Sequence, residues 1–404
     1  MSGIVIIGAG QAGASLAAKL RALGYQGAVT LIGEEPHPPY QRPPLSKAYL
    51  LGEMERDRLY LRAPDFWANH DVALHLDRRV SAINSREKRL TLQDGETLAY
   101  DQLALTTGAR PRMLPVSARS HLGNVFAIRT LADIDALAQT LRPGARVLIL
   151  GGGYIGLEAA AVTAMLRLEV TLVELAPRIL QRVAAPETSD YFRKLHQKHG
   201  VTIFEGVGLD HLVGDGVVRG AVLSDGRTLE ADLVLVGIGI EPNTGLAVKA
   251  GLTMDNGIST DEFGRTSQQS IWAAGDCASF PYQGRRIRLE SVGNAIDQAE
   301  TVAENMLGAS KAYQAKPWFW SDQYDVKLQI AGLNTGYNQV ITRTGQEGAV
   351  SFWYFRDSQL LAVDAINDPR AYMVGKRLIE TGRSPERTAV LDSAIDLKTL
   401  LNQP

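Results

Sequence analysis

Three glycines in the middle of the chain, Gly151, Gly153 and Gly156, have the spacing of a turn that binds nucleotide phosphates. A short apolar run precedes them, and a later apolar run ends at Glu174. The first glycine would permit a tight turn, the second a close approach of a pyrophosphate, and the third close packing of a helix on the strand. The helix N-terminus would offer free N–H groups and a positive dipole to the phosphates. The spacing therefore predicts a strand, turn, helix and strand that bind a dinucleotide.

The acid at the end of this stretch indicates which dinucleotide binds. A carboxylate at Glu174 can accept hydrogen bonds from both ribose hydroxyls, and it would repel a 2′-phosphate. The pattern therefore favours NAD over NADP. We also assign to this site two residues at the start of the helix and the glycine that ends a later buried strand: Tyr154, Ile155 and Gly237.

The N-terminus repeats the pattern with Gly8, Gly10 and Gly13. A strand pattern then ends close to two acids, of which Glu34 is the preferred ribose ligand and Glu35 the alternative. One glycine triplet is a weak signal, because such turns are common. Two complete copies, each followed by an acid, predict two dinucleotide sites on one chain.

Length and composition are those of an ordinary globular protein with two or three domains. The chain has 404 residues, of which 45% are hydrophobic and 21% charged. A formal net charge of −2 gives no global field that would attract nucleic acid or an anionic membrane. The first apolar run is too short for a signal peptide. We therefore expect no nucleic-acid or membrane partner and a cytoplasmic location, and we predict no metal site.

The order of elements predicts an α/β fold with an internal duplication. After each glycine triplet come a helical stretch, a hairpin with an Asp-Gly turn (at Asp94 and at Asp225), a buried strand and a further glycine. A later buried strand ends at Gly275 and Asp276, and we expect it to rejoin the first sheet. The second of two Rossmann-like domains would then be inserted in the first.

From residue 318 the pattern changes to alternating strands followed by a helix at residues 370–380. This pattern predicts a C-terminal α+β domain. The predicted domain ranges are 1–112 with 245–320 for the first nucleotide-binding domain, 113–244 for the second, and 321–404 for the C-terminal domain.

A proline-rich segment at residues 36–47 is expected to form a stiff irregular loop without helix or central strand. A short helix is predicted from Ser46 to Leu51, with Lys47 in its first turn. A lysine is mildly unfavourable at the positive end of a helix dipole, which suggests a specific role. A solvent-facing lysine is an equal alternative on position alone.

Two dinucleotide sites on one chain suggest a flavin and a nicotinamide rather than two nicotinamides. A reduced pyridine nucleotide delivers hydride, whereas a flavin can receive hydride and pass electrons on singly. The sequence thus favours FAD and NADH as the two cofactors.

Several motifs are more specific than the glycine triplets: Pro43-Pro44-Leu45-Ser46-Lys47, Thr107-Gly108, Gly275-Asp276-Cys277-Ala278 and Trp318-Phe319-Trp320-Ser321-Asp322-Gln323-Tyr324. Together with both glycine turns, they make the chain resemble the FAD-dependent, NADH-linked ferredoxin reductases over essentially its whole length. The resemblance implies hydride transfer from NADH to FAD, followed by single-electron transfer to a 2Fe-2S ferredoxin. It also implies that this ferredoxin serves a haem monooxygenase or an aromatic-ring oxygenase.

The resemblance further implies which residues contact FAD besides the glycine turn. We assign Ala12, Glu34, Arg42, Lys47, Val80, Thr107, Gly108, Arg129, Gly275, Asp276 and Val292, with Trp320 at the flavin edge. Plain alternatives are core packing for the two valines, a surface salt bridge for Arg129 and a domain-interface core position for Trp320. Gly293 stands where the family usually has proline.

Lys47 and Glu158 are predicted to form the catalytic pair. Lys47 follows the proline-rich segment, and Glu158 lies in the first turns of the nicotinamide helix, so both could meet where hydride is transferred. A buried lysine needs a carboxylate partner, and the pair could orient the carboxamide and set the charge near flavin N5. The alternative is an interdomain salt bridge without a chemical role.

The chain has a single cysteine, Cys277, so it cannot form an internal disulfide or a Cys-x-x-Cys pair. Relatives of the glutathione-reductase and thioredoxin-reductase kinds pass electrons to a cysteine pair. Without such a pair, electrons must leave the flavin directly for an external acceptor. We expect Cys277 to be a small packed residue rather than a nucleophile.

An acidic ferredoxin would need a basic surface for docking. The candidates are Arg285, Arg286, Arg288, Lys311 and Lys316, although such a run is more often a solvated face. Two other functions remain open: a rubredoxin or quinone reductase, and an apoptosis-inducing-factor-like protein that binds NADH and signals by a change of shape. The latter predicts basic tracts that this chain lacks.

Overall fold

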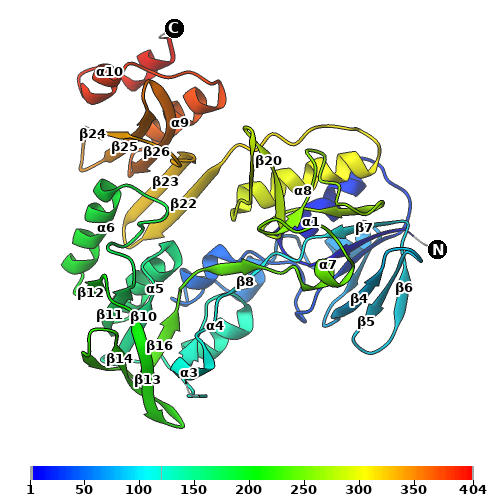
Figure 1. Cartoon of the computed structure of the whole chain (residues 1–404), viewed down its shortest axis with the longest axis horizontal. Coiled ribbons are helices and arrows are strands. Elements are labelled where there is room, and N and C mark those ends of the chain that lie inside the picture. Colours follow the sequence, from blue (N-terminus) through cyan, green and yellow to red (C-terminus); the bar gives the residue numbers. More distant parts are fainter. Residues whose placement is uncertain (1–2, 120, 403–404) are drawn as a thin grey trace. The chain divides into compact units, whose positions relative to one another are not determined.

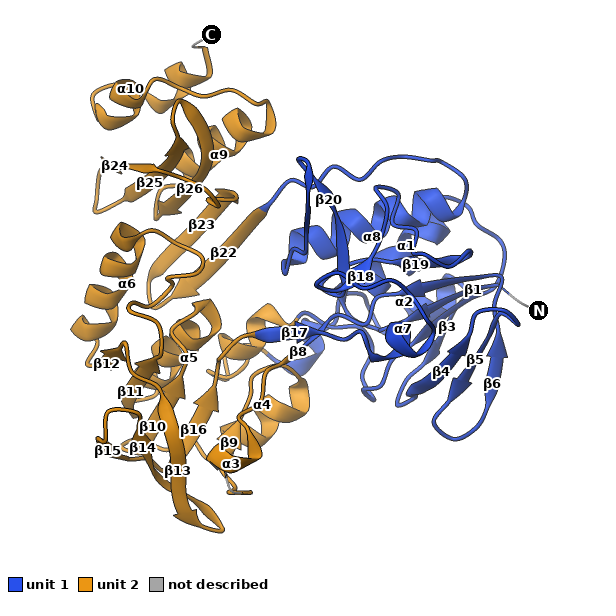
Figure 2. Ribbon diagram, viewed as in Figure 1, with its two compact units in different colours: residues 1–41, 55–110, 240–317 blue, residues 42–54, 111–239, 318–404 orange. Residues whose placement is uncertain are grey.

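The computed structural model describes residues 3–119 and 121–402. The chain divides into two compact units, which Figure 2 shows in different colours. Unit 1 comprises residues 1–41, 55–110 and 240–317, and unit 2 comprises residues 42–54, 111–239 and 318–404.

A five-stranded parallel sheet forms the centre of unit 1, in the order β19-β7-β1-β2-β3. Every residue of β1 is buried, because alternate side chains fill one hydrophobic cluster on each face of the sheet. Strand β19 pairs with β7, so the late strand rejoins the first sheet as predicted. The strands are β1 (Ile4–Ile7), β2 (Val29–Ile32), β3 (Val72–His75), β7 (Gln102–Leu105) and β19 (Ile271–Ala273).

Two helices, α1 (Gln11–Ala22) and α8 (Val292–Met306), pack against each other beside this sheet (Figure 1). The glycine triplet predicted α1, but α8 was not predicted. Its start is marked by Ser291, whose hydroxyl accepts a hydrogen bond from the N–H of Asn294 at 3.2 Å. Gly293 is buried in the first turn of α8.

The other elements of unit 1 form smaller sheets and short helices. The turn at Asp94 and Gly95 joins two antiparallel strands, as predicted. Two short strands, β8 and β17, pair with each other in a sheet of their own. The remaining bounds are β4 (Val80–Asn84), β5 (Arg89–Leu92), β6 (Thr97–Ala99), β8 (Ala109–Pro111), β17 (Ile240–Pro242), β18 (Ile258–Ser259), β20 (Ala278–Tyr282), β21 (Arg285–Ile287), η2 (Arg56–Leu59), α2 (Phe66–Asn69) and α7 (Gly245–Lys249).

A second parallel sheet, in the order β12-β11-β10-β16-β9, forms the centre of residues 111–239 in unit 2. An antiparallel sheet, β13-β14-β15, accompanies it. Strand β13 was not predicted, because it buries a single residue and its apolar alternation is weak. The bounds are β9 (Val125–Phe126), β10 (Arg146–Leu150), β11 (Glu169–Glu174), β12 (Thr202–Glu205), β13 (Leu209–Asp215), β14 (Val217–Leu223), β15 (Thr228–Glu230), β16 (Leu233–Val236), α3 (Val116–Arg119), α4 (Leu131–Ala138), α5 (Tyr154–Met165) and α6 (Pro186–Lys198).

The C-terminal part of unit 2 is an antiparallel sheet in the order β22-β23-β26-β25-β24. Helix α9 packs on β23 and β26, which gives the predicted α+β arrangement. The bounds are β22 (Trp318–Gln323), β23 (Val326–Gly332), β24 (Gln339–Thr344), β25 (Val350–Arg356), β26 (Gln359–Ile366), α9 (Pro369–Glu380), α10 (Arg387–Leu391) and η3 (Leu397–Asn402).

The helix predicted from Ser46 to Leu51 is wrong. A 3-10 helix, η1 (Pro43–Ser46), ends at Lys47, whose φ of −134° and ψ of −115° lie outside the helical region. Turns follow as far as residue 52. The two prolines preset φ for the first helical positions, so the helix begins and ends earlier than expected. The expectation that the proline-rich segment contains no helix is wrong for the same reason.

The predicted fold class is confirmed: two Rossmann-like domains, the second inserted in the first, and a C-terminal α+β domain. Among the described residues, no helix is long and apolar enough to cross a membrane. Helix α8, for example, has 15 residues, whereas a spanning helix needs about 20.

Candidate functional site

The glycine turn between β1 and α1 shows why each glycine is present. Gly8 has a φ of +115°, and a Cβ there would lie 2.2 Å from the carbonyl oxygen of Thr106. A Cβ at Gly13 would lie 2.0 Å from the carbonyl oxygen of Gly8. A Cβ at Gly10, the N-cap of α1, would meet no further heavy atom within 4 Å. Packing within the protein therefore requires the outer glycines, and the middle one leaves open backbone at the helix N-terminus.

The turn between β10 and α5 in unit 2 has the same construction. Gly151 has a φ of +103°, and its Cβ would lie 2.4 Å from the carbonyl oxygen of Gly237. A Cβ at Gly156 would lie 2.0 Å from the carbonyl oxygen of Gly151, whereas a Cβ at Gly153 would meet nothing within 4 Å. Open backbone at the N-terminus of a long helix fits a pyrophosphate, because the N–H groups and the helix dipole both favour an anion.

Predicted FAD residues meet at the carboxyl ends of the strands in unit 1. Thr107 donates its hydroxyl to the carbonyl oxygen of Asn243 at 2.7 Å, and the side-chain amide of Asn243 donates to the carbonyl oxygen of Thr107 at 2.9 Å. Gly108 follows with a φ of +65°. A Cβ at Gly275 would lie 3.0 Å from the Cβ of Ala12. The ends of β7 and β19 thus converge on the start of α1.

Three further predicted FAD residues lie in unit 1. Val80 is buried at the start of β4, Val292 is the first residue of α8, and Asp276 follows Gly275 with a partly exposed side chain. Their contacts with a flavin remain predictions.

The acid after β2 lies beside an open pocket of about 490 Å³. Glu34 lines this pocket, and its carboxylate lies 3.9 Å from the side chain of Arg79. Glu35 instead accepts a hydrogen bond of 2.6 Å from the hydroxyl of Tyr40. This arrangement favours Glu34 as the ribose ligand of the first site, which stays a prediction.

Glu174 is held in place at the end of β11. Its Oε2 accepts the N–H of Gly152 at 2.6 Å, and its Oε1 accepts the N–H of Ala176 at 2.7 Å. Each carboxylate oxygen retains capacity for a further hydrogen bond. The carboxylate is therefore oriented by the protein itself and can still accept from ribose hydroxyls.

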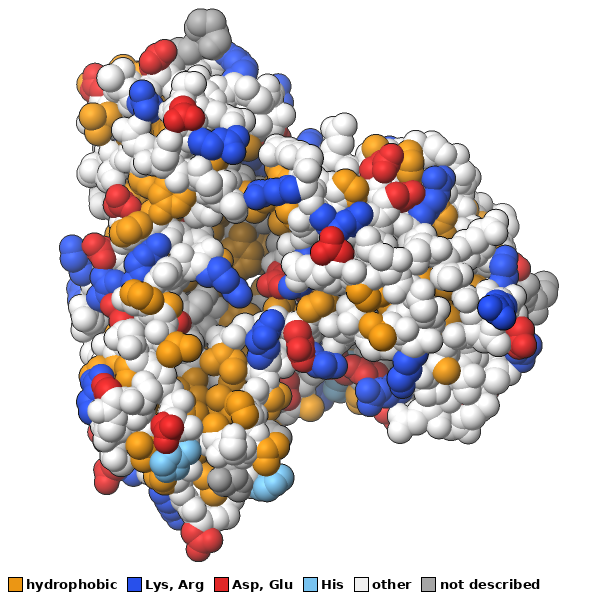
Figure 3. Space-filling model, in the orientation of Figure 1, with side chains coloured by type: hydrophobic (Ala, Val, Ile, Leu, Met, Phe, Trp, Pro, Cys, Tyr) orange, Lys and Arg blue, Asp and Glu red, His pale blue; other side chains and the backbone are white. Residues whose placement is uncertain are grey.

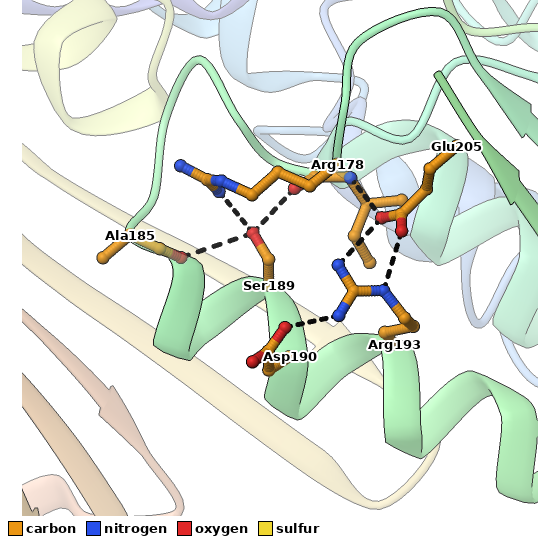
Figure 4. Close-up of polar contacts among 7 residues, drawn as sticks. Arg178, Ala185, Ser189, Asp190, Arg193 and Glu205 are labelled. Carbon is orange, nitrogen blue, oxygen red and sulfur yellow. Dashed lines mark hydrogen bonds and ion pairs between the residues drawn. The ribbon is translucent and has the colours of Figure 1, made fainter. Parts of the chain in front are cut away.

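The loop after β11 is tied to α6 and β12 (Figure 4). Ser189 on α6 donates to the carbonyl oxygen of Ile179 at 2.7 Å and accepts from Arg178. Glu205 on β12 accepts the N–H of Ile179 at 2.7 Å and pairs with Arg193 at 2.9 Å. These contacts fix the loop that carries the backbone partner of Glu174.

Exposed apolar side chains border the second glycine turn. Ile155, Leu175 and Ile238 follow the ends of β10, β11 and β16, and they are 44%, 74% and 41% exposed. Tyr154, also assigned to this site, is the first residue of α5, and its ring packs 5.1 Å from that of Phe319. Exposed apolar groups beside a phosphate turn are suited to cover the flat rings of a nucleotide.

The predicted catalytic pair forms an ion pair inside unit 2. The Nζ of Lys47 lies 3.0 Å from Oε1 of Glu158 and 3.8 Å from Oδ2 of Asp322. Glu158 lies on α5 and is only 5% exposed. It also accepts hydrogen bonds from the hydroxyls of Ser46 at 3.2 Å and Ser321 at 2.7 Å. The structure therefore brings both predicted catalytic residues together.

The pKa of Glu158 is raised above its usual value, because its burial outweighs its favourable partners. Burial raises the pKa of Glu158, whereas the charge of Lys47 and the hydroxyls of Ser321 and Ser46 act to lower it. An ammonium that is fixed by such a buried carboxylate can stabilise negative charge that develops nearby during a reaction.

Trp320 on β22 lies beside this pair. Its ring centre is 5.9 Å from the Nζ of Lys47, and the ring stacks on Trp318 with a centroid distance of 5.4 Å. Two other residues assigned to FAD, Arg42 and Arg129, also lie in unit 2, where Arg42 donates to the carbonyl oxygen of Arg129 at 2.6 Å. Their contacts with a flavin remain predictions.

The polar partners of Glu158 were not predicted from the sequence. Ser46 and Asp322 contact the pair directly, and Ser321 and Gln323 share one buried face of β22. A serine and a glutamine two residues apart lie on the same face of a strand, and here they stand between the aromatic residues Trp320 and Tyr324, which indicates buried polar groups that need partners. The motif at residues 318–324 therefore contains a local signal for these partners.

Cys277 is fully buried, in agreement with the packed role expected for it. Its Sγ lies 3.4 Å from the carbonyl oxygens of Leu105 and Ala274. Burial raises the pKa of the thiol, which disfavours a reactive thiolate.

The basic residues considered for docking are largely engaged within the protein. Arg288 pairs with Glu290 at 2.6 Å, and Lys311 pairs with Glu304 at 2.8 Å. Arg286 donates to two backbone carbonyl oxygens. On the face shown in Figure 3, basic side chains are interspersed with acidic ones. The docking surface therefore stays a prediction.

Comparison with known proteins identifies the family. The family described as pyridine nucleotide-disulphide oxidoreductase matches residues 2–299, and the one described as reductase C-terminal matches residues 318–401. Rhodocoxin reductase of Rhodococcus erythropolis is 40% identical over 401 residues, which cover 98% of this chain and 93% of that protein. Putidaredoxin reductase of Pseudomonas putida is 40% identical over 407 residues, which cover 98% of this chain and 96% of that protein.

Solved structures agree with these matches. The crystal structure of the covalent putidaredoxin reductase–putidaredoxin complex matches with a TM-score of 0.96 and 39% sequence identity, covering 99% of this chain and 98% of that one. The resemblance to ferredoxin reductases indicated by the motifs is thereby confirmed. The chain belongs to the pyridine nucleotide-disulphide oxidoreductase family, within the group that carries the C-terminal reductase domain.

Proposed function

We propose that this protein is an NADH-dependent, FAD-containing ferredoxin reductase. The observation that carries the proposal is one open glycine turn built twice, at the ends of two parallel sheets and each time followed by an acid. A nicotinamide and a flavin are the pair that uses two such sites in a single redox chain. The acceptor would be a 2Fe-2S ferredoxin that serves a haem monooxygenase or an aromatic-ring oxygenase.

Each turn is assigned one cofactor. The NADH residues are Gly151, Gly153, Tyr154, Ile155, Gly156, Glu174 and Gly237, and the FAD residues are Gly8, Gly10, Ala12, Gly13, Glu34, Arg42, Lys47, Val80, Thr107, Gly108, Arg129, Gly275, Asp276, Val292 and Trp320. The fit rests on the backbone left open at Gly10 and Gly153.

Lys47 and Glu158 are assigned to the hydride step. FAD, when bound, supplies a ring that accepts hydride and releases electrons singly. The Lys47 ammonium is 3.0 Å from the Glu158 carboxylate, so its position is set before any substrate binds. A fixed positive charge of this kind favours a transition state in which negative charge grows on the acceptor.

An external acceptor follows from the cysteine content. The only thiol of the chain is buried, and a second one to form a redox pair does not exist in the sequence. The relatives are named rhodocoxin reductase and putidaredoxin reductase, and the second of these has been crystallised in a covalent complex with putidaredoxin. We assign the same kind of acceptor to this chain.

NADH is proposed over NADPH because a preset carboxylate, Glu174, occupies the place where a 2′-phosphate would need a positive charge. A cytoplasmic location is part of the proposal, because NADH is an intracellular reductant.

The test begins with the purified protein. It should be yellow and retain FAD, NADH should bleach the flavin faster than NADPH does, and cytochrome reduction should require an added 2Fe-2S ferredoxin. A colourless protein that cannot retain FAD would exclude the proposal. If added ferredoxins did not change the rate of cytochrome reduction, but the protein reduced a quinone or a rubredoxin, one of these alternative acceptors would be favoured.

Two matched variants test the FAD site and the NADH site independently. At Gly10 and at Gly153 an added Cβ would meet nothing within 4 Å, so we expect Gly10→Val and Gly153→Val to fold. The first should lose FAD, and the second should keep FAD while its reduction by NADH becomes slow. Loss of FAD from Gly153→Val, or unimpaired reduction of this variant, would contradict the assignment.

A further inference from the structure

A row of buried polar side chains leads away from Glu158 through unit 2. The Oγ of Ser321 lies 2.7 Å from Oε1 of Glu158, and the Nε2 of Gln323 lies 3.1 Å from that Oγ. The Nε2 of His196 lies 2.8 Å from Oε1 of Gln323, and the hydroxyl of Tyr324 lies 3.1 Å from Nδ1 of His196. Ser321, Gln323 and His196 are each 0% exposed, so bulk water does not compete for these contacts.

The carboxylate at one end sets the direction of every hydrogen bond in the row. An ionised Glu158 can only accept, so the hydroxyl of Ser321 donates to it and must accept from the amide nitrogen of Gln323. The amide oxygen of Gln323 then faces His196, which must carry its hydrogen on Nε2. Nδ1 of His196 is left to accept from the hydroxyl of Tyr324. All four donors therefore point toward Glu158.

The protonation of His196 agrees with this direction. Burial lowers the pKa of His196 to about 4; the nearby His199 acts in the same direction, and the hydrogen bond with Gln323 acts against it. The ring is therefore neutral at pH 7, as an accepting Nδ1 requires. Besides these groups, Tyr324 faces His196, and its ring stacks on that of His199 at 3.7 Å.

The row joins three elements that are distant in the sequence. Glu158 lies on α5, His196 on α6, and Ser321 and Gln323 on the same face of β22. Tyr324 follows β22 with a φ of +56°, a conformation that is unfavourable for a bulky side chain and that glycine would adopt without strain. Tyr324 is the first residue of the two-residue turn between β22 and β23, and such turns use a positive φ, so the hairpin itself places the Tyr324 hydroxyl beside His196.

We propose that Ser321, Gln323 and His196 are positioning residues that keep Glu158 ionised and turned toward Lys47. Aligned donors polarise one another, so each bond in the row strengthens the next and adds positive potential at the carboxylate. The inference deepens the proposed function and rests on it, because Lys47 is the group assigned there to the hydride step. The C-terminal sheet would thus tune the catalytic pair through β22.

The first test measures the protonation of Glu158 in the FAD-loaded protein by infrared spectroscopy over a range of pH. The band of the protonated carboxyl is assigned by its loss in Glu158→Gln. In Ser321→Ala the midpoint for protonation should rise by about one pH unit, because the carboxylate loses a direct donor. Gln323→Leu should give a smaller rise, and His196→Leu a smaller one again.

A rescue variant distinguishes an effect of directed hydrogen bonds on the Glu158 midpoint from an effect of packing alone. His196→Gln keeps an amide N–H that can reach Gln323, so its midpoint should return toward that of the unaltered protein, unlike that of His196→Leu. Thr163→Val is the matched control, because Thr163 is a buried residue of α5 whose hydroxyl bonds only carbonyl oxygens of its own helix. Its midpoint should not move.

The second test determines which atoms in the row donate and which accept hydrogen bonds. Nitrogen NMR of histidine-labelled protein should show His196, assigned by its absence in His196→Gln, as the neutral form with hydrogen on Nε2. Gln323→Glu offers only acceptors to Ser321 and His196, so it should raise the pKa of His196 and the midpoint of Glu158.

Two results would overturn the proposal. One is hydrogen on Nδ1 of His196, and the other is an unchanged Glu158 midpoint in both Gln323→Leu and His196→Leu when thermal melting shows that they are folded. The rate of flavin reduction by NADH should follow the same midpoint in each variant. Because the infrared and NMR measurements need no NADH, failure of the row can be told apart from failure of the reductase assignment.

Discussion

The two units contain the same nucleotide turn but differ in what lies buried behind it. Of the described residues, four acidic or basic side chains are buried, Glu158, His196, Arg343 and Asp364, and all four belong to unit 2. The buried polar residues described in unit 1 are neutral, such as Thr106, which donates its hydroxyl to the carbonyl oxygen of Gly8 at 2.9 Å.

This difference indicates a division of labour. A turn that only has to hold a cofactor can be built from glycines and backbone groups on an apolar support. A unit that also controls charge needs buried ionisable groups, which are costly unless each has partners. Unit 2 therefore carries the electrostatic part of the proposed chemistry, and its stability should respond to pH and to charge removal more strongly than that of unit 1.

The largest expected effect tests whether the two turns are equivalent. Gly13→Ala and Gly156→Ala each place a Cβ 2.0 Å from a backbone carbonyl oxygen, so each should lower the free energy of unfolding by about 3 kcal/mol or more. Gly10→Ala and Gly153→Ala are the controls, because both positions have negative φ and open space. Urea denaturation measures the four values. A much smaller loss for one of the outer glycines would show that the turns are not built alike.

A second comparison uses one paired lysine from each unit. Lys47→Met leaves Glu158 buried without its cation, so we expect a loss of about 2 to 3 kcal/mol in unfolding free energy. Flavin reduction by NADH, measured by stopped flow, should slow about 10- to 100-fold. Lys19 pairs with Glu304 at 3.1 Å on the surface of unit 1, and Lys19→Met should cost less than about 1 kcal/mol. Equal effects of the two changes would contradict the division of labour.

The buried carboxyl group of Asp364 predicts how the stability of the protein depends on pH. Burial raises the pKa of Asp364 to about 6, although Tyr354 and Thr188 donate hydrogen bonds to it. Between its ordinary pKa and about 6, the folded state holds a proton that the unfolded chain has lost, so this group destabilises the fold as pH rises through that window. Asp364→Asn should therefore be more stable than the unaltered protein at pH 8, by roughly 2 kcal/mol, and show no advantage near pH 4.

The effect of His196 on stability changes with pH in the direction opposite to that of Asp364, which makes the test more specific. Its pKa is lowered to about 4, so the unfolded chain binds a proton that the folded state refuses, and stability is lost as pH falls from about 6.5 to about 4. The two groups offset each other between pH 4 and 6. Asp364→Asn should then lose stability on acidification more steeply than the unaltered protein. Parallel pH profiles for the two proteins would contradict the account.

Much of the fold could be predicted from the sequence, because periodic apolar runs and glycine spacing are local signals. The strand that ends at Gly275, for example, returns to the first sheet as predicted, where β19 pairs with β7. Two failures concern local signals that were not used. Helix α8 was not predicted although Ser291 caps it, and the helix predicted from Ser46 to Leu51 is replaced by η1, which two prolines begin at Pro43.

The site was predictable in part. Lys47 and Glu158 were paired from the sequence because a buried lysine needs an acid, and the structure places them 3.0 Å apart. The row from Ser321 to His196 could not be predicted, because it depends on three elements meeting in space. From the sequence alone, a buried histidine on an amphipathic helix cannot be distinguished from an ordinary core or surface residue.

The smallest expected effect concerns the two acids that follow the turns. Glu174 accepts two backbone N–H groups, whereas Glu34 is an exposed side chain beside an open pocket. Glu174→Gln loses one acceptor, so it should cost about 1 kcal/mol in unfolding free energy. The preference for NADH over NADPH in kcat/KM should also fall about tenfold, because the charge that repels a 2′-phosphate is gone. Glu34→Gln should change stability by less than about 0.5 kcal/mol and leave that preference untouched, since it belongs to the other turn. If Glu34→Gln altered the preference as much as Glu174→Gln, the assignment of NADH to unit 2 and FAD to unit 1 would have to be reversed or abandoned.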